Sequence, residues 1–215
     1  ITHAEGKLAG GVAKRLGYVR CYQGTNDTLI CESPGWGTPT KLLPGVKLVP
    51  NRMPSSFTTS KLGGVAIATS PASQKVALAW MANATPSAGQ NQSEVFYLES
   101  TNNGKDWMIA GTMPAPIKVT DYEAGGFKTV AYDDIAAVYD YSDRLHIIWN
   151  TYVSGNSNDV SLWQWSDTTG VRKITSHFAS SDCDPGDWNL ILAKMTAGVE
   201  YLSADPAYNY IYTTY

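Results

Sequence analysis

The chain has 215 residues, a formal net charge of −3 and 16% charged residues, against roughly 25% in an average soluble domain. With so little net charge and no run of Lys or Arg, the sequence argues against nucleic acid as a partner. There is also no apolar stretch of about 18 residues, so we expect no transmembrane helix and no membrane insertion.

Short runs rich in aromatic and β-branched residues, bounded by Gly, Pro, Asn, Asp or Ser, predict strands along most of the chain. They fall into about four sets, at about 8–45, 62–115, 130–178 and 186–215. The first set contains LAGGVAKRLG, YVRCYQG, TLICESP and GWGTPTKLL. The second contains GGVAIATS, KVALAWMA, EVFYLEST and the weaker MIAGTMP, and the third contains DIAAVYDY, RLHIIWNTY, DVSLWQWSD and VRKITS. The last begins with WNLILAKM and ends with YIYTTY.

Each set opens with a small, apolar strand, which suits the crowded centre of a β-propeller. A longer aromatic strand and a more polar outer hairpin follow, and the period of roughly 50 to 70 residues is that of propeller blades. We therefore predict an all-β fold. It would be a single domain over 1–215, a β-propeller or partial propeller of about four blade-like repeats.

Related polar motifs occur at the same place in the second and third sets. STNNGKDW and SDTTGVRK follow the order S-x-D-x-G-x-x-W of an Asp-box, with substitutions, through Ser100, Asn102, Gly104 and Trp107 in one and Ser166, Thr168, Gly170 and Lys173 in the other. In such a turn short polar side chains bind the backbone, and Gly supplies a positive φ. The motif occurs between the third and fourth strands of propeller blades in sialidases and in unrelated proteins, so it indicates a fold and leaves the chemistry open.

The stretch YVRCYQGTNDTLICESPGW predicts a hairpin with its turn centred on Asn26. This register places Cys21 opposite Cys31 and Arg20 opposite Glu32. One interpretation is a stapled surface hairpin with a cross-strand disulfide and a cross-strand ion pair. The other interpretation is a ligand site.

Within that stretch, the order VRCYQ, GTNDT, LICES and GWGTP resembles one blade of the fungal fucose-binding lectins, the propellers of the orange-peel mushroom lectin type. In that family the Arg and Glu of a blade hydrogen-bond the sugar hydroxyls, and an aromatic side chain stacks on the apolar face of the sugar. The resemblance implies that Arg20, Glu32 and Trp36 bind a sugar, with fucose as the first candidate. It also implies a non-catalytic lectin without a cofactor, whose partners are glycans or glycoproteins.

Two further tryptophans offer a second place for a sugar. Trp163 and Trp165 alternate along one predicted strand and therefore share a face. They either pack within a blade or, where exposed, form a platform for a sugar ring.

A secreted sialidase-like glycoside hydrolase is the alternative function, and a propeller scaffold for protein interaction is a third. A sialidase needs arginines for the substrate carboxylate, a tyrosine nucleophile with a glutamate partner, and an aspartate acid. NRMP, with Arg52, is similar to an element near the start of sialidases, although a proline-containing loop explains it as well. Other glycosidases need two facing carboxylates. The acidic stretch that could supply them, or form a solvated loop, contains Asp121, Glu123, Asp133, Asp134, Asp140 and Asp143.

Metal chemistry has little support. The three cysteines form no CxxC pattern, so no zinc site is expected. The loop SSDCDPGDW at 180–188 holds three acids that could bind Ca²⁺, but a turn explains it as well, and we predict no metal.

An extracellular location is expected. The first residue is Ile1, which suggests a processed mature chain or a fragment. N-glycosylation sequons begin at Asn26, Asn83 and Asn91, and the expected disulfide points the same way. Because 215 residues are few for a large ring, a homo-oligomer that completes or multiplies the propeller is one of the open arrangements.

Overall fold

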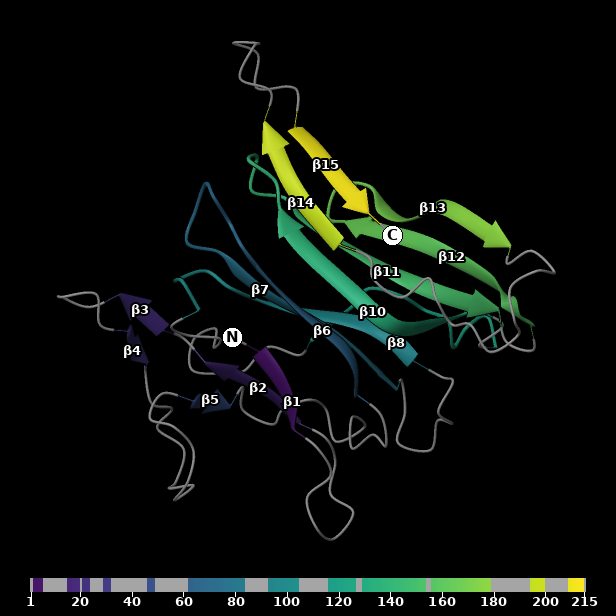
Figure 1. The fold of residues 1–215 in the computed structure, drawn as a ribbon, viewed down its shortest axis with the longest axis horizontal. Coiled ribbons are helices and arrows are strands. Elements are labelled where there is room, and N and C mark those ends of the chain that lie inside the picture. Colours follow the sequence, from purple (N-terminus) through teal and green to yellow (C-terminus); the bar gives the residue numbers. More distant parts are fainter. Residues whose placement is uncertain are drawn as a thin grey trace, which may run out of the picture.

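The computed structural model describes twelve parts of the chain, and all of them are strands or turns, with no helix among them (Figure 1). None of these parts therefore offers a helix that could cross a membrane. The described residues are 2–5, 15–19, 21–23, 29–31, 46–48, 62–83, 93–104, 116–126, 129–153, 156–178, 194–199 and 209–214.

Two antiparallel four-stranded sheets form the central part of the molecule. The first has the order β6 (Leu62–Thr69), β7 (Val76–Asn83), β8 (Ser93–Ser100) and β9 (Ile117–Lys118). The second has the order β10 (Thr129–Tyr139), β11 (Leu145–Val153), β12 (Asn156–Ser166) and β13 (Gly170–Phe178). The all-β prediction is confirmed for the described residues, as are seven of the eight strands expected here. The remaining expected strand, MIAGTMP, lies outside the described residues, and the fourth strand of the first sheet is β9.

The N-terminal strands are divided between two small sheets. One has the order β1 (Thr2–Glu5), β2 (Arg15–Val19) and β5 (Val46–Leu48), and the other pairs β3 (Cys21–Gln23) with β4 (Leu29–Cys31). The strands expected from LAGGVAKRLG, YVRCYQG and TLICESP lie in part in β2, β3 and β4, whereas GWGTPTKLL lies outside the described residues. A single residue separates β2 from β3, whereas antiparallel neighbours need a turn of about two residues to fold back on each other.

The last described strands, β14 (Lys194–Val199) and β15 (Asn209–Thr214), form an antiparallel pair. This pair lies beside the second four-stranded sheet, where β14 contacts β10 (Figure 1). The second sheet thus has the first sheet on one of its faces and the β14–β15 pair next to the other.

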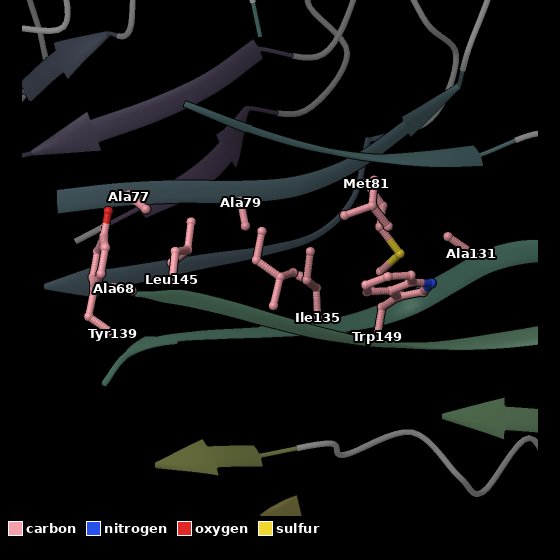
Figure 2. Packing of buried hydrophobic residues seen from close by; sticks show 11 residues of the cluster. Ala68, Ala77, Ala79, Met81, Ala131, Ile135, Tyr139, Leu145 and Trp149 are labelled. Carbon is pink, nitrogen blue, oxygen red and sulfur yellow. The ribbon is translucent and has the colours of Figure 1, made fainter. Parts of the chain in front are cut away.

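The two four-stranded sheets share one hydrophobic core. The first sheet contributes three alanines, Ala68, Ala77 and Ala79, to this core, and such small side chains let the sheets approach closely (Figure 2). Strand β7 is buried on both faces, since Ala77 and Ala79 on one side and Leu78 and Trp80 on the other are at most 1% exposed. The shared core comprises Ala68, Ala77, Ala79, Met81, Val95, Ala131, Ile135, Tyr139, Leu145, Ile147 and Trp149.

The predicted polar turns follow the third strand of each sheet, β8 and β12. Ser100 Oγ accepts a hydrogen bond from the Gly104 backbone N–H at 3.1 Å, and Gly104 has a φ of +68°. Ser166 Oγ accepts one from the Thr169 N–H at 3.1 Å, and Gly170 has a φ of +64°. The glycines occupy the left-handed region that the motif requires.

Candidate functional site

Three aromatic side chains from the two facing sheets form a partly exposed strip beside the shared core. Trp163 and Trp165 of β12 lie on the same face, as their spacing predicts, and Tyr97 of β8 joins them from the other sheet. The Tyr97 and Trp165 rings are tilted by 42°, with centroids 5.0 Å apart. We call Tyr97, Trp163 and Trp165 the aromatic strip.

Strand pairing and hydrogen bonds hold the strip in place. The Trp163 indole N–H donates to Thr151 Oγ1 at 3.0 Å, which fixes the plane of the ring. In the neighbouring strand β13, Lys173 is the Cα partner of Trp163, and Val171 is the Cα partner of Trp165. Lys173 Nζ lies 5.9 Å from the Trp163 centroid, and Val171 is 42% exposed. The strip is therefore bordered by an exposed cationic side chain and an exposed apolar one.

The polar groups near the strip suit neutral hydroxyl ligands. Burial, followed by the negative charges of Glu99 and Asp167, raises the pKa of Tyr97 above its ordinary value. The phenol therefore keeps its proton and can donate a hydrogen bond, while the carboxylates can accept bonds from hydroxyls. Aromatic faces beside such groups are the usual means of holding the C–H side and the hydroxyls of a sugar together.

A polar cluster at one end of the sheets contains the Tyr and Glu pair that a sialidase would need. The Tyr139 hydroxyl donates to Glu99 Oε2 at 2.7 Å, and Lys75 Nζ lies 3.7 Å from Glu99 Oε1 and 3.3 Å from Asp143 Oδ2. However, Tyr139 is only 1% exposed, and burial and Glu99 raise its pKa instead of lowering it. A buried, protonated phenol is a poor nucleophile, so this cluster fastens the two sheets together.

Glu94 organises the segment that follows β9. It is fully buried, accepts the Thr120 hydroxyl hydrogen bond, and accepts the Glu123 backbone N–H at 2.9 Å. Lys118 Nζ lies 3.4 Å from Glu94 Oε1 and 2.8 Å from Asp121 Oδ1. A buried carboxylate with these partners is satisfied, so Glu94 acts here as a structural group.

The acids predicted as glycosidase candidates are distributed over several polar contacts among the described residues. Asp121 and Glu123 lie 2.8 and 3.9 Å from the same Lys118 Nζ, Asp140 contacts His146, and Asp143 contacts Lys75. The backbone of Glu123 binds Glu94, the backbone of Asp134 binds Asn150, and Asp133 lies in β10. In the same part of the chain, no group of three or more His, Cys, Asp or Glu could hold a metal ion.

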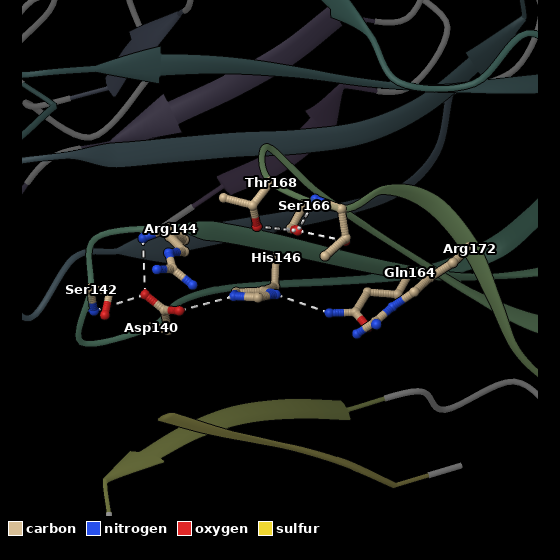
Figure 3. A network of polar contacts seen from close by, with 9 residues as sticks. Asp140, Ser142, Arg144, His146, Gln164, Ser166, Thr168 and Arg172 are labelled. Atoms are coloured by element: carbon tan, nitrogen blue, oxygen red, sulfur yellow. Dashed lines mark hydrogen bonds and ion pairs between the residues drawn. The ribbon is translucent and has the colours of Figure 1, made fainter. Parts of the chain in front are cut away.

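A second polar network lies on the opposite face of β11 and β12 from the aromatic strip (Figure 3). Arg172 Nε and Nη2 both donate to Gln164 Oε1, at 3.1 and 2.7 Å. This leaves the Gln164 amide N–H to donate to His146 Nδ1 at 2.9 Å, so the imidazole carries its proton on Nε2, 3.3 Å from Asp140 Oδ2. Asp140 Oδ1 in turn accepts the Ser142 and Arg144 backbone N–H groups.

Several predicted site residues lie outside the described residues. They are Arg20, Asn26, Glu32, Trp36, Arg52, Asn91, Trp107 and the loop 180–188. Asn83 ends β7, but its side chain is outside the described set. In the β3–β4 hairpin, Cys21 and Cys31 are Cα partners, so the register predicted for this hairpin is confirmed, whereas the disulfide stays a prediction.

Tyr97, Tyr139 and Gln164 are site residues that the sequence pattern did not predict. The local sequence around Tyr97 and Tyr139 is that of ordinary strands. Tyr97 contacts Trp165, and Tyr139 contacts Glu99, in each case a residue of the facing sheet. Gln164 stands between the two tryptophans of DVSLWQWSD, and its place on the opposite face of the strand was the available signal.

Comparisons with known proteins identify no family for this chain. A scan against protein-family models finds no match, and a search of curated proteins finds none either.

Proposed function

We propose that this protein is a secreted, non-catalytic carbohydrate-binding protein. The observation that carries the proposal is the aromatic strip, where Tyr97, Trp163 and Trp165 stay partly exposed between two sheets beside carboxylates and a lysine. Aromatic faces desolvate the C–H side of a sugar ring, and the neighbouring carboxylates accept bonds from its hydroxyls.

We also include in this proposal the resemblance of the N-terminal stretch to one blade of the fungal fucose-binding lectins. On this account the four-stranded sheets are blades of a β-propeller, and the strip is a binding place between two of them. Arg20, Glu32 and Trp36 form a second site of the fucose-lectin kind on the N-terminal hairpin. Glycans or glycoproteins are the partners, and a homo-oligomer would raise avidity by presenting several weak sites together.

Secretion belongs to the same proposal. A Cys21–Cys31 disulfide requires an oxidising compartment, and glycans on Asn26, Asn83 or Asn91 require passage through a secretory pathway. The paired positions of the two cysteines support the disulfide. Both modifications are common on extracellular binding proteins.

A glycan array with the purified chain tests the function. We expect selective binding, with fucosides as the first candidates, and a loss of about tenfold or more in Trp165→Ala if the strip is the site. Loss in Arg20→Ala instead would assign the binding to the hairpin. Tyr141→Ala is the matched control, because Tyr141 is an exposed aromatic residue in the β10–β11 turn. An array without any selective binding contradicts the proposal.

A further inference from the structure

The polar network of Asp140, His146 and Gln164 ends at Arg172 and holds its exposed guanidinium in one orientation. Arg172 is exposed on β13, whereas Gln164 and Asp140 are 5% and 2% exposed, and His146 is partly buried. Each member orients the next through a hydrogen bond. Backbone N–H groups orient the Asp140 carboxylate, which orients the His146 ring, and the ring orients the side-chain amide of Gln164. Gln164 then holds Arg172 through both Nε and Nη2.

Arg172 differs from Lys75 and Lys118 in the kind of group that holds its positive charge. Lys75 and Lys118 are each within 4 Å of carboxylates. Arg172, by contrast, is held by a neutral amide oxygen, and none of the described acids forms an ion pair with it. Its orientation is therefore fixed while its positive charge stays uncompensated by the described residues.

The unused hydrogens of Arg172 define the ligand. Gln164 occupies the Nε and one Nη2 hydrogen, which leaves Nη1 and the other Nη2 hydrogen as a planar fork. Such a fork matches the two oxygens of a carboxylate. Because β-strand side chains alternate, this fork lies on the opposite face of the sheet from the aromatic strip.

We propose that Arg172 binds the carboxylate of an acidic sugar, and that Gln164, supported by His146 and Asp140, positions it. That the ligand is a sugar rests on the proposed carbohydrate-binding function, but the site is separate from the strip. Gln164, His146 and Asp140 are positioning residues, since they act through the guanidinium.

The test compares binding of methyl β-glucuronide and methyl β-glucoside by the purified full chain. We expect the glucuronide to bind more tightly than the glucoside, and more weakly as ionic strength rises. Arg172→Ala should lower glucuronide affinity by about tenfold or more, because a charge-assisted bidentate contact is lost. Arg172→Lys should lose part of the affinity, because it keeps the charge but not the fork. Arg144→Ala is the matched control: Arg144 is also exposed, but it joins the network through its backbone N–H.

Gln164→Glu tests whether Gln164 positions the Arg172 guanidinium for binding or only stabilises the sheet. The new carboxylate would pair with Arg172 and neutralise it, so the glucuronide preference should disappear. The substitution also removes the N–H that donates to His146 Nδ1, so the fold of the variant is checked by its thermal midpoint and near-UV circular dichroism. A purely structural role predicts an unchanged ratio of acidic to neutral affinity in this variant. That result, or full glucuronide affinity in Arg172→Ala, overturns the inference.

The outcomes also separate this inference from the proposed function. One outcome is that Trp165→Ala abolishes binding of neutral sugars while Arg172→Ala leaves the glucuronide affinity unchanged. This outcome refutes the Arg172 site and supports the carbohydrate-binding function. Glucuronide binding that depends on Arg172, without any neutral binding, supports the site and refutes the function proposed for the strip.

Discussion

The hydroxyl of Tyr139 donates a hydrogen bond of 2.7 Å to Glu99 and so joins the end of β10 to β8 of the facing sheet. Tyr139→Phe keeps the buried ring and removes only this bond to an ionised acceptor. We expect the free energy of unfolding to fall by about 1–3 kcal/mol, measured by urea denaturation. Tyr141→Phe, at an exposed tyrosine two residues away, should change it little. Equal stability of the two variants would mean that the bond does not tie the sheets together.

Asp143 gives the fold a predictable dependence on acid. Partial burial alone would raise its pKa, but hydrogen bonds from Ser70 and Ser73 and the interaction with Lys75 outweigh this and lower the pKa below its ordinary value. The ionised form is therefore favoured in the folded state. Its stabilisation is fully present above the unfolded-state pKa of about 4 and is lost as the pH falls through the folded-state pKa.

The matched variant is Asp143→Asn, because Asn tolerates the φ of +63° at this position. We expect it to be less stable than the wild type at neutral pH, with a difference that narrows below about pH 4. Thermal unfolding across a pH series measures this. A difference that stays constant from neutral to strongly acid pH would contradict the assignment to the carboxylate charge.

Ala79 tests how closely the sheets approach. It is fully buried on the face of β7 that contacts the second sheet. Ala79→Leu adds volume where the core has little room, and we expect a loss of about 1–3 kcal/mol. Ala72→Leu, in the exposed β6–β7 turn, is the control and should be close to neutral. An Ala79→Leu protein as stable as the wild type would refute close packing at this place.

The register of β3 and β4 predicts a cross-strand disulfide. Cys21 and Cys31 are Cα partners, a separation that permits a bond between their sulfurs. After alkylation of the unreduced, denatured protein, mass spectrometry should find a single modified cysteine, Cys183. Three modified cysteines would show that the pair stays reduced and would weaken the case for secretion.

Much of the central fold follows from local sequence pattern. DIAAVYDY, RLHIIWNTY, DVSLWQWSD and VRKITS predict the strands of the second sheet because each run has its own period and its own turn residues. The turns after Ser100 and Ser166 were predictable for the same reason, since their hydrogen bonds stay within a few residues.

Features that depend on distant residues were not predictable in this way. The separation of β2 from β3 depends on partners at 2–5 and 46–48, which local pattern does not specify. In the candidate site, the shared face of Trp163 and Trp165 followed from strand alternation, but their neighbour Tyr97 did not. It belongs to another sheet, 68 positions from Trp165 along the chain (165 minus 97).

The most direct test of the central claim is a titration of the chain with neutral methyl glycosides, the fucoside among them, followed through the indole N–H signals of its seven tryptophans by NMR. If the aromatic strip binds sugar, the assigned signals of Trp163 and Trp165 shift with one common saturation curve. If no indole signal shifts with any glycoside, the strip is packing between two sheets, and the carbohydrate-binding function is contradicted.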